Sequence, residues 1–474
     1  MSQPFILFDL TRLIGATGRA APTGIERVEA QYARRLAKRS PEDVAFVVTL
    51  AGTVRPVSTA SVRDFLARQT RTWKNGHDDC TNEDVLANVA RFLDGGPAIP
   101  PVPYGHMSRE ERFANFTARA TGGFAVWGRE MVRAFAKGRL TPALGAILAE
   151  RPVLYLTVSA DRMENEAPFA RLKEAGVTVA VFGHDTIPLD YPELVRKGAP
   201  SSCRKRTRTL GRVADGVIAN SHFSAARIAD HLGDNCPKMC VAHLGIERPR
   251  PHAFNAPLGT APYFLMVSTI EAKKNHQLIL KIWRRMVQEL GEKTPKLVIV
   301  GKRGWEVDTP LAMLDRVREL RPYVLETGVV PDTALAVLRK NAHAILMPSI
   351  VEGFGLPVPE ALVCGTPVIA SDIDAFREVA GNACELVDSD DFMGWYQTIL
   401  AYADETSGRR AAALERVRAY KAPTWDEHFS TVDTFLDDLT GAQRGAFSPR
   451  KWARRTRPTP QPAAVPLTNT LKGA

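Results

Sequence analysis

The sequence of 474 residues has no apolar run that approaches the roughly 18 residues a helix needs to cross a bilayer. Its start, residues 1–10, lacks the basic residues and the long apolar core of a signal peptide, and Phe5–Phe8 is typical of a first buried strand. The six cysteines are scattered without a framework, which is ordinary in a reducing compartment. We therefore expect a cytoplasmic protein without disulfides.

Two familiar motif classes are missing or weak. No Gly-x-Gly-x-x-Gly turn follows a predicted strand, which disfavours a nicotinamide oxidoreductase. Asp372-Ile-Asp374 has the spacing of a manganese motif, but we expect it to cap the next helix instead. A zinc site is also disfavoured, because metal spacing alone is a weak signal and Cys240 falls in a short predicted strand; its candidate ligands are His231, Cys236, Cys240 and His243.

Acidic residues are absent from two basic stretches. Residues 441–474 hold seven basic residues, no acid and much proline, so we predict a basic disordered tail there. Residues 196–212 again combine seven basic residues with no acid. Either stretch suits peripheral contact with an anionic membrane, or simply a solvated face. Neither carries the interleaved aromatics of a nucleic-acid surface, so we expect no nucleic acid partner.

What the chain does have is a regular alternation of short apolar runs and longer helical patterns. The runs are continuous rather than alternating, which indicates parallel strands buried on both faces. A proline-rich seam at residues 247–262 divides the chain. We predict an α/β fold of two Rossmann-like domains with parallel sheets facing a central cleft: residues 1–255, with a helical insertion at about 51–151, and residues 256–440.

The strongest local signal is the segment Glu352-Gly-Phe-Gly-Leu-Pro-Val-Pro-Glu360, which follows the predicted strand Ala344–Met347. Pro357 suits the first turn of a helix, and Gly365 is a favoured residue just past its end. The glycines leave bare amides before the helix, which suits a diphosphate. The two glutamates would repel phosphate and are better placed to accept hydrogen bonds from sugar hydroxyls.

This segment resembles that of the family 4 retaining glycosyltransferases, which have the GT-B fold and two glutamates separated by seven residues. The resemblance implies that Glu360 holds the donor ribose and that Glu352 lies near the donor sugar, as a catalytic residue. It also implies that the phosphates face the backbone of Gly353, Phe354, Gly355 and Leu356.

A second segment, Val267–Asn275, places two lysines between a predicted strand and a helix, where they would neutralise a departing diphosphate. Lys274 matches the lysine of the family and is predicted to be catalytic. Thr269 stands where many members have arginine, so we expect Lys273 or Arg303 to replace it in binding the donor. Arg303 directly follows the strand Leu297–Val300, and its fork suits phosphate oxygens.

Two segments of the first half complete the predicted site. His184 and Asp185, in His-Asp-x-Ile-Pro, follow the strand Val177–Phe182 and would point toward the donor sugar; a strand-end turn is the structural alternative. Mannosyltransferase-like enzymes that build bacterial surface polysaccharides often carry that motif. Thr23 and Glu26 have capping-box spacing, and the resemblance places Gly24 beside the donor phosphates or the acceptor.

We therefore expect a retaining hexosyltransferase that uses a nucleotide diphosphate sugar and no metal or other cofactor. GDP-mannose is favoured from the resemblance alone, and the expected acceptor is a saccharide or a lipid-linked saccharide. A nucleotide-sugar epimerase of the same fold would instead release a free sugar without any acceptor. A non-catalytic polysaccharide-binding protein is the third alternative, which hydrolysis of the donor would exclude.

Overall fold

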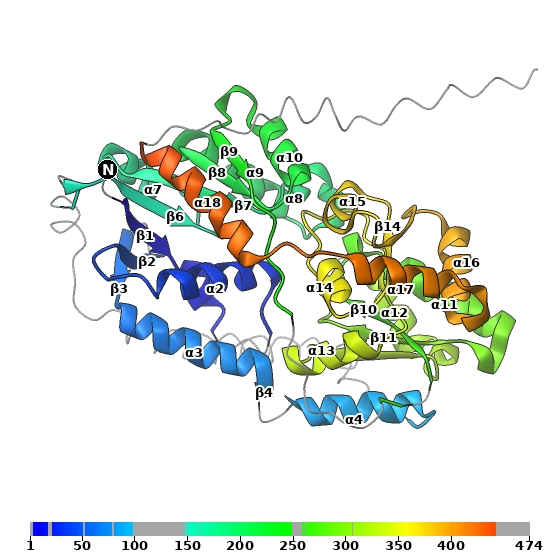
Figure 1. The fold of residues 1–474 in the computed structure, drawn as a ribbon. Coiled ribbons are helices and arrows are strands. Elements are labelled where there is room, and N and C mark those ends of the chain that lie inside the picture. Colours follow the sequence, from blue (N-terminus) through cyan, green and yellow to red (C-terminus); the bar gives the residue numbers. More distant parts are fainter. Residues whose placement is uncertain are drawn as a thin grey trace, which may run out of the picture.

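The computed structural model describes residues 3–17, 21–50, 53–77, 80–97, 147–148, 150–160, 162–248, 258–259, 261–305 and 307–441. Two sheets lie side by side, each surrounded by helices (Figure 1). Residues 98–146 and the predicted basic tail beyond Gly441 lie outside the described residues. No helix in the described ranges combines the length and the apolar character that a bilayer crossing requires.

The first sheet has seven strands in the order β3-β2-β1-β6-β7-β8-β9. All neighbours are parallel except the edge pair β2–β3, which is antiparallel. Every residue of β1 and β6 is buried, as continuous apolar runs predict. The strands are β1 (Phe5–Asp9), β2 (Val44–Leu50), β3 (Thr53–Val57), β6 (Val153–Thr157), β7 (Thr178–Gly183), β8 (Gly216–Ala219) and β9 (Lys238–Val241).

The second sheet has six strands in the order β12-β11-β10-β13-β14-β15, all parallel. Two parallel sheets connected by helices confirm the predicted fold class. The strands are β10 (Tyr263–Val267), β11 (Lys296–Val300), β12 (Val324–Gly328), β13 (Ala344–Met347), β14 (Val368–Ser371) and β15 (Glu385–Val387).

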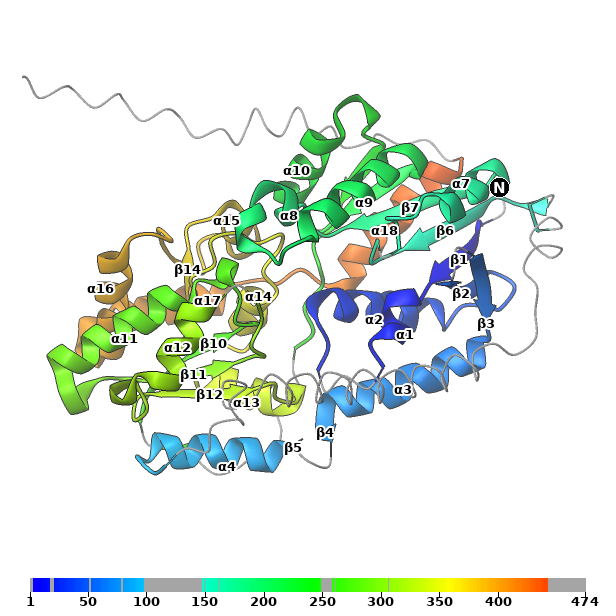
Figure 2. The same cartoon turned by 180° about the vertical axis from the view of Figure 1, so that it is seen from behind.

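Helices follow most strands of both sheets (Figures 1 and 2). Those in the first half are α1 (Thr11–Gly15), α2 (Gly24–Leu36), α3 (Thr59–Asn75), α4 (Asn82–Leu93), α7 (Ala167–Glu174), α8 (Ile187–Asp190), α9 (Ala199–Val213) and α10 (His222–Leu232). Those in the second half are α11 (His276–Leu290), α12 (Asp308–Arg316), α13 (Asp332–Asn341), α14 (Pro357–Val363), α15 (Asp374–Ala380), α16 (Phe392–Ala403), α17 (Arg409–Ala419) and α18 (Trp425–Thr440).

Two helices pack on the domain to which their sequence neighbours do not belong. Helix α4, from the first half, packs on α13 and β12 of the second sheet, and both ribbon views place it there (Figures 1 and 2). Helix α18, near the end of the described chain, packs on β7 and β9 of the first sheet. The domain ranges 1–255 and 256–440 stay predictions. Because of these two helices, each sheet is covered partly by a helix from the other range.

The region 51–151 differs from the expected helical insertion at its start. Residues Thr53–Val57 form β3, which extends the first sheet by pairing antiparallel with β2. Helices α3 and α4 then follow, joined through the short two-stranded pair β4 (Gly76–His77) and β5 (Cys80–Thr81). Only two residues connect β2 to β3, and antiparallel strands can be joined by so short a connection. The alternation of strands and helices in the sequence does not predict such an edge strand.

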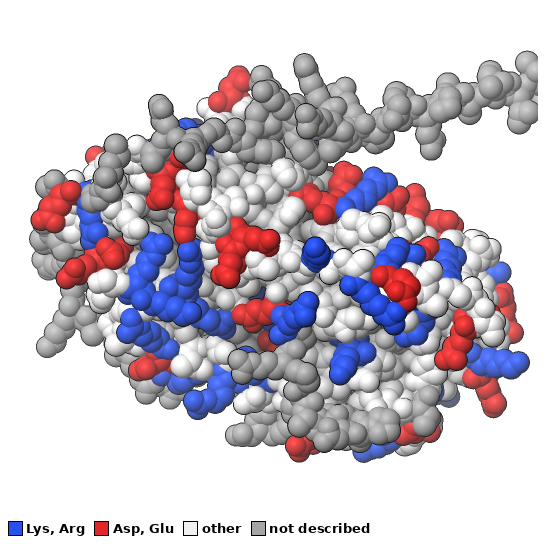
Figure 3. All heavy atoms as spheres, in the orientation of Figure 1, with Lys and Arg blue, Asp and Glu red and all other residues white. Residues whose placement is uncertain are grey.

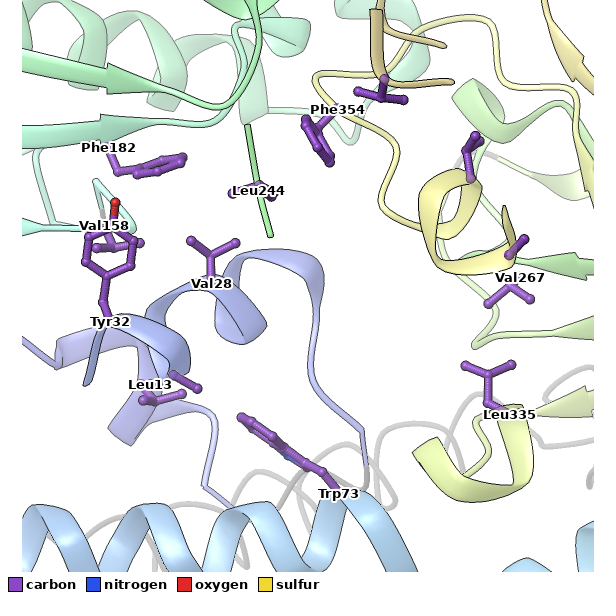
Figure 4. Packing of buried hydrophobic residues seen from close by; sticks show 14 of the residues in the cluster. Leu13, Val28, Tyr32, Trp73, Val158, Phe182, Leu244, Val267, Leu335 and Phe354 are labelled. Atoms are coloured by element: carbon purple, nitrogen blue, oxygen red, sulfur yellow. The ribbon is translucent and has the colours of Figure 1, made fainter. Parts of the chain in front are cut away.

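The apolar core is continuous across the two sheets. One cluster includes Phe182 of β7, Leu244 of the connection between the domains, and Val267 and Phe354 of the second domain (Figure 4). Tyr32 of α2 packs in the same cluster with its ring against Phe182. The loops at the carboxyl ends of the two sheets are therefore held against each other by buried apolar contacts.

Candidate functional site

The loop from β13 into α14 has the local structure that its residues predict. Pro357 is the first residue of α14, where its missing N–H costs no hydrogen bond. The helix ends at Val363, and Gly365 adopts φ +82° beyond it. Gly355 also has positive φ, +80°, and its missing side chain leaves room for the ring of Phe376.

Glu352 forms a buried ion pair with Lys274. Its carboxylate accepts hydrogen bonds from Lys274 Nζ and, at 2.8 Å, from Ser349 Oγ, and the two charged side chains are 8% and 15% exposed. Burial raises the pKa of Glu352, but the charges of Lys274 and Lys273 outweigh burial and hold that pKa below its usual value. The structure therefore joins two predicted site residues as an ionised pair.

Lys273 is surrounded by carboxylates from both domains. Burial lowers the pKa of Lys273, but Asp185, Glu352 and Glu271 outweigh burial and raise the pKa above its usual value. Glu271 Oε2 lies 3.9 Å from Lys273 Nζ. Because Asp185 belongs to the first domain, the electrostatic contact of Asp185 with Lys273 crosses between the domains, and Lys273 remains charged at neutral pH.

His184 and Asp185 begin the loop after β7. His184 Nε2 lies 2.6 Å from the carbonyl oxygen of Val158, and the ring lies against Phe182. Burial lowers the pKa of His184 to about 4, so the ring is neutral at pH 7, and its Nε2 donates to the carbonyl. Asp185 Oδ1 accepts a hydrogen bond from the Ile187 amide at 3.2 Å, the contact of a strand-end turn.

Gly353 is the point where the two loops touch. A Cβ atom at Gly353 would lie 2.7 Å from the carbonyl oxygen of His184, 3.0 Å from Asp185 Cβ and 3.2 Å from Ser224 Oγ. All three atoms belong to the first domain. Only glycine fits at this position, because the first domain leaves no room for a side chain there. The glycine is therefore required by this close approach and not by an unusual backbone angle.

The amides of Gly353, Phe354, Gly355 and Leu356 donate no hydrogen bond to any described residue. The first three residues are nevertheless buried. Buried amides in folded proteins almost always have a partner. The loop therefore presents unpaired N–H groups beside the positive charges of Lys273 and Lys274, a suitable setting for an anionic oxygen.

Gly24 lies across the domain boundary from this loop. Thr23 and Glu26 form the predicted capping box at the start of α2, which is confirmed. A Cβ atom at Gly24 would be 3.5 Å from Leu356 Cδ1, so the start of α2 faces the start of α14. Three residues on, Arg27 pairs through both terminal nitrogens with Asp332 of the second domain.

Glu360, the predicted ribose ligand, forms an ion pair with Arg339 of α13. Burial lowers the pKa of Arg27, but Asp332 and Glu360 raise it and prevail, which places Glu360 within electrostatic reach of the first domain. Glu360 is thus oriented by one arginine and lies toward a second.

Arg303 has other partners than the predicted phosphate. Its guanidinium donates to Asp315 at 2.7 and 3.0 Å and to Glu326 at 2.6 to 3.1 Å, so that every nitrogen donates to a carboxylate. Glu326 belongs to β12, the strand next to β11, whose carboxyl end Arg303 follows. The donor-binding role of Arg303 stays a prediction that these contacts disfavour.

Several residues that the sequence did not single out connect the domains at this site. Ser221 Oγ donates to the Gly353 carbonyl at 2.6 Å, and Ser224 Oγ donates to the same oxygen at 3.1 Å. Glu378 of α15 accepts the amides of His222 and Phe223 at the start of α10 and also contacts His243 Nε2 at 2.6 Å. Their sequence positions carry no motif that would reveal them.

The metal alternatives have other contacts in the structure. Asp372 binds Arg377 at 2.6 and 2.7 Å, and Ile373 rather than an aspartate is the N-cap of α15 without a side-chain cap; the expected cap is therefore wrong. His231 contacts Asp190 and Cys240 packs in the core. Within the described ranges, no three His, Cys, Asp or Glu side chains are grouped so as to hold a metal ion.

Comparison with known proteins agrees with this geometry. The family model described as glycosyl transferases group 1 matches residues 248–393, which include the lysine pair and the loop before α14. The chain also resembles a structure of Anabaena Alr3699/HepE in complex with UDP and glucose, with a TM-score of 0.56, 13% identity and coverage of 93% of this chain and 100% of that chain. The chain therefore has the GT-B fold and contains a glycosyltransferase group 1 domain.

The chain is also similar in sequence to curated proteins described as mannosyltransferases. O-antigen chain mannosyltransferase B of Escherichia coli is 33% identical over 165 residues, 35% of this chain and 42% of that protein. The serotype-specific mannosyltransferase WbdA of Escherichia coli is 30% identical over 227 residues, 44% of this chain and 28% of that protein. The chain thus spans less than half the length of these relatives.

Proposed function

We propose that this protein is a retaining glycosyltransferase that moves a hexose from a nucleotide diphosphate donor to a saccharide or lipid-linked saccharide in bacterial polysaccharide synthesis. The observation that carries the proposal is the group of buried amides at residues 353–355, which donate to no described residue, beside Lys273 and the ion pair of Lys274 with Glu352, at the contact between the domains. Such a group matches the charge of a diphosphate.

In the proposed reaction the bond between the sugar's anomeric carbon and the diphosphate breaks, and the acceptor oxygen attacks the same face of the sugar. The departing phosphate takes the acceptor's proton. Lys273 and Lys274, with the amides of the loop, stabilise the charge that develops on the phosphate. Glu352 holds the Lys274 ammonium in place, and its carboxylate can accept a hydrogen bond from a sugar hydroxyl.

Mannose is the proposed sugar and GDP-mannose the proposed donor. The identity of 30 to 33% with proteins described as mannosyltransferases supports the sugar. A thermal-shift panel of GDP, UDP and dTDP tests the base, because the bound nucleotide raises the melting temperature. GDP should give the largest shift.

Transfer itself is tested with radiolabelled GDP-mannose and a lipid-linked saccharide. Labelled product with retained anomeric configuration, seen by NMR, is expected, together with activity that survives a chelator. Release of free sugar without acceptor would support the epimerase instead, and neither transfer nor hydrolysis would favour the binding protein.

Peripheral contact with the inner face of a membrane is proposed for the basic helix α9. Arg204, Lys205 and Arg208 are exposed on it and form no ion pair with any described residue. Lys and Arg also gather over α2 and α3 in the face shown in Figure 3. Co-sedimentation with phosphatidylglycerol vesicles, but not phosphatidylcholine vesicles, is expected, and loss of binding at high salt would fit an electrostatic contact.

A further inference from the structure

Ser221 and Ser224 of the first domain converge on one carbonyl of the second. Both side chains are almost completely buried, with 0% and 1% exposed. Ser221 is the N-cap of α10, and its oxygen accepts the Ser224 amide at 3.0 Å while its proton goes to the Gly353 carbonyl at 2.6 Å. Ser221 therefore joins the start of α10 directly to the loop before α14.

Ser224 holds both candidate loops at once. Its hydroxyl donates to the His184 carbonyl at 2.9 Å and to the Gly353 carbonyl at 3.1 Å, a shared hydrogen bond. The first carbonyl follows β7 and the second follows β13. One buried hydroxyl thus fixes the spacing between the two halves of the candidate site.

The planar peptide bond carries this constraint further. In a trans peptide the C=O and the following N–H point in opposite directions, and the structure has no cis peptide bond among its described residues. Since the Gly353 carbonyl points to α10, the Phe354 N–H points away from it. That amide donates to no described residue.

We infer that Ser221 and Ser224 are positioning residues that aim the Phe354 amide at the donor diphosphate, and that they do so only when the domains are closed. The inference rests on the proposed function, because it assigns that loop to the diphosphate. The hydroxyls lie in one domain and the amide in the other. Closure of the domains would therefore align the amide at the same time.

The kinetic test compares Ser224→Ala and the double variant Ser221→Ala/Ser224→Ala with wild-type enzyme. Charge grows on the leaving phosphate in the transition state, so kcat should fall about tenfold in the single and roughly 100-fold in the double variant, while the donor KM changes less than about threefold. Ser221→Thr keeps both cap and donor and should retain wild-type kcat. Ser371→Ala removes another fully buried hydroxyl, one without a hydrogen-bond partner among the described residues, and controls for a general packing effect.

A spectroscopic test separates this inference from the proposed function. In protein labelled with 15N-phenylalanine, the Phe354 amide resonance, assigned with Phe354→Leu, should move on addition of GDP or UDP and should move much less in Ser224→Ala. An unmoved Phe354 resonance in wild type, or unchanged kcat in the double variant, would overturn the positioning role. Absence of sugar transfer by wild type, with the resonance still moving, would overturn the proposed reaction alone.

Discussion

Two glycines that lie two residues apart should respond to alanine in opposite ways. A methyl group at Gly353 would meet three atoms of the first domain, the closest at 2.7 Å, where ordinary contact begins at 3.4 Å. A methyl group at Gly355 would overlap Phe376, which belongs to the same domain, and would force alanine to φ +80°. Gly353→Ala therefore strains the contact between domains, and Gly355→Ala strains one domain internally.

The magnitude follows from ordinary overpacking, which costs about 1 to 3 kcal/mol. At Gly353 that cost falls on the closed arrangement and is relieved when the domains separate. About 2 kcal/mol corresponds to a change of roughly 30-fold in the equilibrium between closed and open forms, so kcat/KM should fall by 10- to 100-fold if chemistry needs the closed form. The melting temperature should change little.

At Gly355 the cost includes about 1 kcal/mol or more for the left-handed backbone and cannot be relieved by separation of the domains. The free energy of unfolding should fall by about 2 to 4 kcal/mol, with a lower melting temperature. Calorimetry, donor kinetics and small-angle scattering on both variants make the comparison. Wild-type kcat/KM in Gly353→Ala, or a melting temperature as low as that of Gly355→Ala, would refute the reasoning that Gly353 reports on domain contact.

Substitutions at three further residues of the site, Lys274, Glu360 and His184, test their separate roles. Lys274→Ala removes the cation that pairs with the buried Glu352 carboxylate, so turnover should fall about 100-fold and the free energy of unfolding by about 3 kcal/mol. Lys274→Arg keeps the positive charge and should retain more of both. Unchanged turnover in Lys274→Ala would contradict a role in catalysis. Glu360→Ala should raise the donor KM about tenfold with little change in kcat, because the donor loses the carboxylate proposed to bind its ribose and Arg339 loses its ion-pair partner. A wild-type KM in steady-state kinetics would exclude the ribose contact. The pKa of His184 is about 4 in the folded protein and about 6.5 in the unfolded chain, so the folded protein loses up to roughly 3 kcal/mol of stability as pH falls from 6.5 to 4. In urea unfolding across this range, the free energy of unfolding of His184→Gln should depend less steeply on pH than that of wild type. An identical pH dependence would show that His184 is not buried in its neutral form.

The local structure of the candidate site was predictable because its causes are local. Pro357 and Gly365 determine where α14 begins and ends through their own backbone preferences, and Thr23 with Glu26 determines the start of α2. Continuous apolar runs likewise predicted the buried strands of two parallel sheets. Each of these signals depends on residues only a few positions apart.

The partners of the site residues were not predictable, because they come from distant segments. The bond from Ser221 to Gly353 spans 132 positions, and that from Lys274 to Glu352 spans 78. Arg303 illustrates the same limit, since its place after a strand suggested phosphate, while Glu326 on the neighbouring strand competes for it. Position along one strand does not reveal the charge on the next.

The exchange of helices between the domains has a consequence for how the protein can be divided. Helix α4 covers β12 and α13 of one body, while α18 returns to the other, where Phe435 and Leu439 pack directly against the backbone of Gly216. A cut in the connecting segment near residue 255 would separate each sheet from a helix that seals it. The two halves should therefore be insoluble when made alone and should recover a folded state only when they are produced together.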